Sequence, residues 1–336
     1  MCHIKNLKTI GQSLRGKPLF LSVVVLSFFL TLPFSIGDKI VGSSELNLVT
    51  DTSTALSRYG EIIYQYNEKS PQQLFVIGMA HRDSLTRRNG SQTSRVQAEV
   101  YKIGEWLIRN RELELLLPEG YFAGKVGKIE NENLTVARGK KSDCPASVDL
   151  SALEEILSDN QSFVNAEMLL RDSYPSLKIL QVEDLALYEM ARRRIIELIE
   201  QKNSCDYLLL RSELDYLQER RTAAILQRIP EIVNEESRWG NIRDRKAILT
   251  IGMSHIHAMI KYFGENRITI YAPLSNSNHH EDYVSKLNLL NEDFGISVII
   301  PRTLADDQKI LKLNKLEKVI AQARRKTSGL PSIALP

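Results

Sequence analysis

The 336-residue chain is long enough to bury a sizeable core, in one large α/β domain or in two smaller domains. Its 25% of charged and 43% of hydrophobic residues are ordinary for a globular protein. The formal net charge is only +3, and the basic residues are scattered without interleaved aromatic residues, so nucleic-acid binding is not indicated.

The three cysteines, Cys2, Cys144 and Cys205, form no Cys-x-x-Cys motif. The sequence therefore lacks the usual signature of a zinc ribbon or of a dithiol redox site. Cys2 belongs to the N-terminal leader. Cys144 and Cys205 either pair in an oxidising compartment or remain separate thiols, and both alternatives stay open.

Residues 1–37 have the pattern of a secretory leader. Four basic residues precede an apolar segment from Leu19 to Phe34, and Ser35 and Gly37 occupy the −3 and −1 positions for cleavage before Asp38. This pattern predicts export to the periplasm or out of the cell. The leader is either removed as a signal peptide or kept as a membrane anchor, which would be the chain's one contact with the membrane.

The rest of the chain is expected to form one α/β domain over 38–325, followed by a flexible tail over 326–336. A helix is predicted over 55–67. A strand ending at Gly78, a helix with an apolar face from Val96 to Ile108 and a strand over 113–117 then form a βαβ unit. Such a unit implies parallel pairing and a right-handed crossover. Residues 123–148 are rich in Gly, Lys and Asn and predict a polar surface insert.

The second half of the domain continues the alternation. Helices are predicted over 150–170, 185–201, 206–234, 255–263 and 309–325, with Pro230 expected to kink or stop the long central one. Strands are predicted over 177–182, up to Gly252, over 267–272 and over 296–300. The expected fold is therefore a mostly parallel or mixed sheet flanked by helices.

One motif occurs twice. Gly78-Met-Ala-His81 and Gly252-Met-Ser-His255 each follow a short apolar run. Each histidine is therefore expected just beyond the carboxyl end of a strand, the edge at which open α/β sheets bind ligands. If the two strands share one sheet, the two histidines can converge on one site. The alternative is two unrelated strand-to-helix turns that contain histidine.

Other polar residues are predicted at the same edge. Glu119 follows the strand over 113–117, and Glu183-Asp184 follows the strand over 177–182. Two imidazoles with one or two carboxylates are usual ligands of a divalent ion that activates water, and they suit Zn, Mn, Co or Fe(II). Glu119 is alternatively a simple turn residue between a proline and a glycine.

Two adjacent arginines, Arg220 and Arg221, lie on the long helix predicted over 206–234. A guanidinium can hold a carboxylate or stabilise a developing oxyanion, so both are catalytic candidates together with Glu119. The alternative for both arginines is a solvated helix face.

These motifs, taken in order, resemble the TraB/PrgY–TIKI superfamily with its GumN-like envelope proteins. The resemblance extends more distantly to the erythromycin-esterase and ChaN haem-binding families. It is carried by Val76–His81, the strand ending in Glu119, Glu219-Arg220-Arg221 and Ile251–His255, and it spans about Gln73 to Phe263. The chain departs from the usual pattern at Met79 and Met253, where smaller residues are common.

The resemblance implies an α/β fold in which His81, Glu119 and His255 are metal ligands or catalytic residues. Arg220 or Arg221 would be their polar partner, and Glu183 is similar to a mid-chain glutamate of the family. It thereby implies an exported, metal-dependent hydrolase of the peptidase or esterase type. Two alternatives remain: a non-catalytic envelope protein that binds haem or a peptide signal, and motifs that only shape turns.

Overall fold

The computed structural model describes residues 55–80, 91–122, 149–158, 164–201, 206–272 and 282–327. The predicted leader, the insert over 123–148, Cys144, Cys205 and His81 lie outside these residues. Of the predicted tail, only its first two residues are included, at the end of the last helix. No helix within the described ranges has the length and apolar character needed to span a membrane.

The centre of the molecule is a six-stranded sheet in the order β1-β8-β2-β5-β3-β4. β1 runs antiparallel to β8, whereas every other neighbouring pair is parallel. The predicted mostly parallel α/β sheet is therefore confirmed, with one antiparallel strand at its edge. The strands are β1 (Gly60–Tyr66), β2 (Gln73–Met79), β3 (Leu115–Pro118), β4 (Lys178–Ile179), β5 (Lys246–Gly252) and β8 (Gly295–Pro301).

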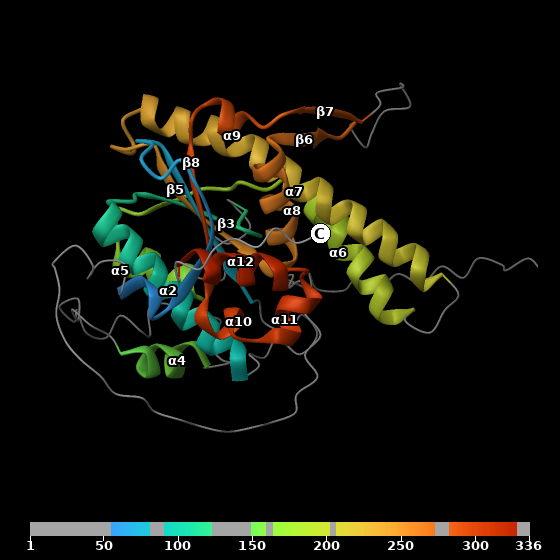
Figure 1. Ribbon diagram of the computed structural model, residues 1–336, viewed down its shortest axis with the longest axis horizontal. Coiled ribbons are helices and arrows are strands. Elements are labelled where there is room, and N and C mark those ends of the chain that lie inside the picture. The colour runs from blue at the N-terminus through green and yellow to red at the C-terminus, as the bar shows by residue number, and fades with distance from the viewer. Residues whose placement is uncertain are drawn as a thin grey trace, which may run out of the picture.

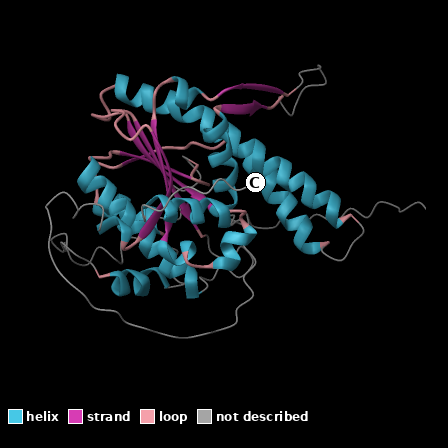
Figure 2. Cartoon of the chain, in the orientation of Figure 1, coloured by secondary structure: helices cyan, strands magenta, loops and turns pink. Residues whose placement is uncertain are grey.

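Helices cover both faces of this sheet (Figures 1 and 2). One face is packed by α2 (Ser91–Arg111), with α4 (Leu150–Ser158), α5 (Ala166–Ser173) and α10 (Arg302–Ala305) against it. The other is packed by α8 (Met253–Glu265), with α7 (Tyr207–Arg238) outside it and α9 (Asn288–Asn291) beside α7. The remaining elements are α6 (Leu185–Glu200), α11 (Gln308–Leu313), α12 (Glu317–Thr327) and the separate hairpin of β6 (Arg267–Ile270) and β7 (Tyr283–Lys286).

The apolar runs that predict β2 and β5 are explained by this double cover. In both strands, six of the seven residues are buried. A parallel strand with helices on both faces has no solvated side, so its sequence is almost continuously apolar. On α2, the predicted stripe of Val96, Val100, Ile103 and Leu107 is fully buried. The sheet and α2 thus share one core.

The helix predicted over 55–67 is wrong. A short helical turn at 55–57 leads instead into the strand β1. The segment Gly60–Tyr66 holds two isoleucines and two tyrosines, which favour a pleated surface, and pairing with β8 supplies the hydrogen bonds. The prediction for 150–170 merges α4 and α5, and Pro230 lies inside α7 without ending it.

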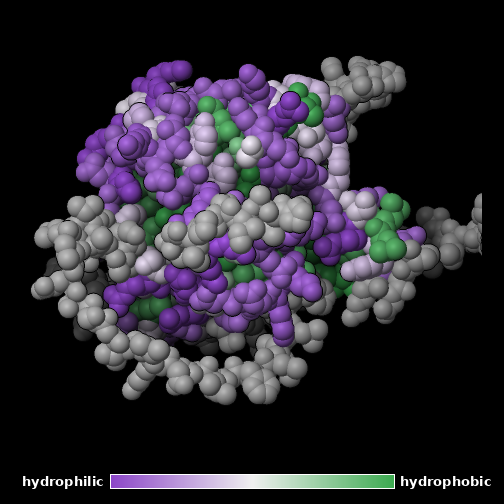
Figure 3. All heavy atoms as spheres, viewed as in Figure 1, coloured by the Kyte–Doolittle hydropathy of each residue, from purple (hydrophilic) through white to green (hydrophobic). Residues whose placement is uncertain are grey.

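The pair α6–α7 extends beyond the sheet (Figure 1). On the first turn of α7, Leu208 is 78% exposed and Leu209 is 60% exposed. Figure 3 shows an apolar patch at this outer end, on a face that is otherwise mostly hydrophilic. The inner part of α7, by contrast, is buried against the sheet side and carries the residues of the site described below.

The close packing around Gly295, at the start of β8, predicts that a larger residue there destabilises the fold. A methyl group there would fall on the carbonyl oxygen of Asn67. We expect Gly295→Ala to lower the free energy of unfolding by about 1–3 kcal/mol, because backbone must move to admit the methyl group. Urea unfolding of the full chain, followed by circular dichroism, measures the change.

The matched control is Gly264→Ala in α8, where an added Cβ meets no atom of the described ranges within 4 Å. Alanine is the better helix former, so this variant should be unchanged or more stable by up to about 1 kcal/mol. Equal stability of the two variants would contradict the close approach at Gly295.

Candidate functional site

The two Gly-Met-x-His motifs leave the sheet side by side. β2 and β5 are neighbouring parallel strands, with Gly78 opposite Ile251 and Met79 opposite Gly252. The segments that follow β2 and β5 therefore leave the sheet at the same carboxyl edge. The glycine of the first motif is required by this packing, since a Cβ at Gly78 would lie 2.9 Å from the sulfur of Met253. The two motifs are thus in direct contact.

The first motif is fixed at its carboxyl end by Gln97 on α2. The Nε2 amide of this buried residue donates to the carbonyl oxygen of Ala80 at 2.9 Å, and its Oε1 accepts from the N–H of Ala166 at 2.9 Å. His81 is the next residue after Ala80 and lies outside the described ranges. The backbone from which His81 departs is therefore held by α2 and α5.

Glu119 lies where β3 turns out of the sheet, bonded to the second motif. Its N–H donates to the carbonyl oxygen of Thr250 at 2.9 Å, and the next residue, Gly120, adopts a positive φ of 75° that glycine accepts without strain. The Oε2 atom of Glu119 accepts from the N–H of Gly252 at 2.5 Å. Because Gly252 caps the amino end of α8, this carboxylate lies at the positive end of the helix dipole.

Glu183 faces Glu119 from the segment between β4 and α6. Its Oε2 accepts from the N–H of Gly120 at 2.7 Å. Burial, and the neighbouring carboxylate of Glu119, raise the pKa of Glu183, against the opposing effect of Arg221. Asp184, the predicted companion of Glu183, instead caps α6 by accepting from the N–H of Leu187.

The guanidinium of Arg221 joins the two carboxylates. Nε and Nη2 donate to Oε1 of Glu183 at 2.8 and 2.5 Å, and Nη2 also donates to Oε1 of Glu119 at 2.9 Å. All three side chains are at most 2% exposed. Burial acts to lower the pKa of Arg221, but Glu183 and Glu119 outweigh it and raise that pKa. The ring of Tyr188 also borders the cluster, with its centre 5.3 Å from the guanidinium carbon of Arg221.

His255 is held in one tautomer by α7. Its Nδ1 lies 2.6 Å from Oγ1 of Thr222, and that hydroxyl donates its only proton to the carbonyl oxygen of Gln218 at 2.7 Å. Thr222 must therefore accept from His255, so the neutral ring carries its proton on Nδ1. The lone pair of Nε2 then faces Oε1 of Glu119 at 3.4 Å, and Nε2 has no hydrogen-bond partner in the described part of the chain.

Arg220 lies apart from this cluster. Its Nη2 donates to the carbonyl oxygen of Ala272, and its guanidinium carbon lies 5.7 Å from the ring centre of Tyr271. The structure therefore brings Arg221, rather than Arg220, to the predicted carboxylates. Of the predicted site residues, Glu119, Glu183, Arg221 and His255 come together.

The residues fit a metal ion in part. Within the described ranges, no group of three or more His, Cys, Asp or Glu side chains is arranged to hold one. Two ligand atoms about 2.1 Å from one tetrahedral ion lie about 3.4 Å apart, which is the separation of His255 Nε2 and Glu119 Oε1. In both glutamates, each carboxylate oxygen already accepts a hydrogen bond. Glu119 also faces His255 at the spacing of two ligands, so His255 and Glu119 could supply two ligands, with the remainder from outside the described residues.

Three supporting residues are absent from the predictions made from the sequence: Thr222, Gln218 and Gln97. Gln218 lies four residues before Thr222 and three before Arg221, so it contacts both of them along α7. A hydroxyl in the otherwise apolar stretch that follows Arg221 is the signal that could have indicated Thr222. Gln97 has no comparable signal, because its partners come from distant parts of the chain.

The ion cluster predicts a large stability effect for Arg221→Met. This change leaves two buried carboxylates without their cation, and we expect the free energy of unfolding to fall by about 3–5 kcal/mol. The control Arg211→Met removes an arginine of α7 that is 54% exposed and should cost at most about 0.5 kcal/mol. The triple variant Glu119→Gln, Glu183→Gln, Arg221→Met should be more stable than Arg221→Met alone. Similar stabilities for the two single variants would contradict the cluster.

The tautomer of His255 predicts an NMR result. Spectra of the 15N-histidine-labelled chain, at a pH where the ring is neutral, should show the proton on Nδ1. Thr222→Val removes the acceptor and should move the proton to Nε2, where Glu119 can accept it, whereas Thr222→Ser should preserve the wild-type tautomer. A wild-type ring protonated on Nε2 would overturn the assignment.

Comparison of the chain with protein-family models, with curated proteins and with solved structures gives no match. The resemblance to the TraB/PrgY–TIKI superfamily therefore stays a prediction, and the function has to be argued from the site itself.

Proposed function

We propose that the protein is an exported hydrolase that activates water at His255 and Glu119, with a divalent metal ion as cofactor. The observation that carries this proposal is Nε2 of His255, which has no hydrogen-bond partner among the described residues and lies 3.4 Å from Oε1 of Glu119. Arg221 already neutralises the Glu119 carboxylate, but the lone pair of the buried imidazole still lacks a proton or a cation. A water molecule or a metal ion placed between the two atoms would supply it.

The chain's own residues have separate roles in this proposal. His255 would offer the lone pair of Nε2 to the ion, because Thr222 keeps its other nitrogen protonated. Glu119 would supply a carboxylate oxygen to the same ion. Arg221 holds Glu119 in place, and Glu183 holds Arg221, so these two are positioning residues.

The metal is assigned to His255 and Glu119, with His81 as the third candidate ligand. Nitrogen and carboxylate ligands suit Mn, Co, Zn or Fe. When bound, such an ion lowers the pKa of its water towards neutrality. Glu183, predicted as a further ligand, is better explained as a partner of Arg221.

The substrate class and the location follow from the sequence. The resemblance to the TraB/PrgY–TIKI superfamily supports a peptide or a small ester as substrate, and the basic and apolar leader supports export. Glu119 lies beside His255, which supports a hydrolase over the envelope-binding alternative.

The proposal is tested by metal content and hydrolysis in parallel. The full chain, purified without chelator, should contain about one divalent ion, and a panel of peptides and esters should reveal hydrolysis. His81→Ala with His255→Ala should lose both, and Glu119→Gln should lower kcat by about 10²-fold or more.

The matched control is His257→Ala, which removes an exposed histidine two residues further along α8. It should keep both the metal and the activity. Metal-free protein that still hydrolyses substrate through His255 would remove the ion from the proposal. Bound metal without hydrolysis of any substrate would favour the envelope-binding protein.

A further inference from the structure

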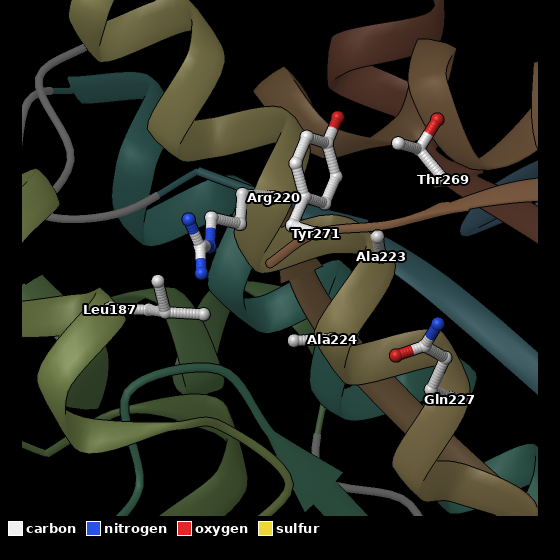
Figure 4. A pocket seen from close by; sticks show the side chains of 7 residues that line it. All are labelled: Leu187, Arg220, Ala223, Ala224, Gln227, Thr269 and Tyr271. Atoms are coloured by element: carbon white, nitrogen blue, oxygen red, sulfur yellow. The ribbon is translucent and has the colours of Figure 1, made fainter. Parts of the chain in front are cut away.

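A small cavity lies between α6, α7 and β6 (Figure 4). Its volume is about 90 Å³, and Leu187, Arg220, Ala224, Gln227, Thr269 and Tyr271 line it. A water needs roughly 10–15 Å³ on this measure, so the space admits several waters or one small organic anion. Ala224, Gln227, Thr269 and Tyr271 are partly exposed, so the cavity can be reached from solvent.

Arg220 brings a positive charge into this cavity without an acidic partner. It is only 8% exposed, and its one hydrogen bond among the described residues goes to the carbonyl oxygen of Ala272. No carboxylate in the described part of the chain lies within 4.0 Å of it, and the adjacent Glu219 is exposed. Its neighbour Arg221 is paired with two carboxylates. A buried cation left in this state is costly, and a bound anion would offset the cost.

Gln227 adds a second unpaired donor. Its Nε2 is buried and has no hydrogen-bond partner among the residues that the structure describes. Arg220 and Gln227 are two turns apart on one face of α7, and the residues between them include Ala223 and Ala224. These short side chains leave room for a ligand between the two donor groups. Both residues line the same cavity from one helix.

We propose that this cavity binds a small monocarboxylate, with Arg220 as its cationic anchor and Gln227 as its second donor. A guanidinium matches the two oxygens of a carboxylate. One cation balances one negative charge, which disfavours inorganic phosphate. Leu187 and Ala224 offer contacts to a short alkyl group. The site is separate from the His255–Glu119 pair and does not depend on hydrolysis.

The test is the affinity of the full chain for sodium propionate, from saturation-transfer NMR at fixed pH and ionic strength with chloride as the balancing anion. Arg220→Gln should weaken binding at least 10-fold. Gln227→Glu should do the same, because it places a carboxylate of the chain beside Arg220, and it should raise the melting temperature in chloride. The control Arg211→Gln removes an exposed charge from α7 and should bind within about twofold of wild type.

The outcomes are separable. If propionate and acetate bind but N-acetylglycine does not, the ligand is a free small acid. If N-acetylglycine binds equally well, the ligand is the terminal carboxylate of a larger molecule. Wild-type protein that shows no saturation by propionate, or that binds phosphate as well, would overturn the proposal. Unchanged affinity in Gln227→Glu would overturn it too, even if Arg220→Gln failed to fold.

Discussion

The site depends on one buried cation. The guanidinium of Arg221 binds Glu119 at the end of β3 and Glu183 before α6, so a single side chain joins three segments that are distant in sequence. Buried ion pairs contribute little net stability, but removing one partner is costly, because the remaining charges stay buried. The cluster therefore fixes where these segments meet rather than simply stabilising the fold. It also sets the position of the carboxylate that faces His255.

Helix α7 organises the polar chemistry of the molecule. Successive helical residues are 100° apart, so Arg220 and Arg221 serve different faces. Gln218 accepts from Arg221 and, at its carbonyl oxygen, from Thr222, and Thr222 in turn accepts from Nδ1 of His255, which fixes the tautomer of that ring. On the face of Arg220, the small cavity has a free positive charge. Mutations on α7 can therefore separate the two sites.

Local pattern predicts the two buried strands, because almost continuously apolar runs are typical of strands covered on both faces. It leaves open whether the two motifs share one edge, which is decided by the pairing of β2 with β5. The pattern does not predict β1, whose pairing with β8 overrides the helical spacing of residues 55–67. Nor does it tell Arg220 from Arg221, since either arginine fits a helix face and only tertiary packing decides which one meets the glutamates. Thr222 is not predicted for the same reason: its role depends on the packing that places its hydroxyl between the carbonyl oxygen of Gln218 and Nδ1 of His255.

The most direct measurement is a crystal structure of the full chain grown with Mn²⁺ and recorded at the manganese absorption edge. We predict one anomalous peak about 2.1 Å from Nε2 of His255 and from an oxygen of Glu119, with His81 completing the set and Arg221 still bound to Glu183. A map without a peak between these atoms, with Nε2 of His255 protonated and donating to Glu119, would contradict the central claim that this pair is a metal-assisted water-activating centre.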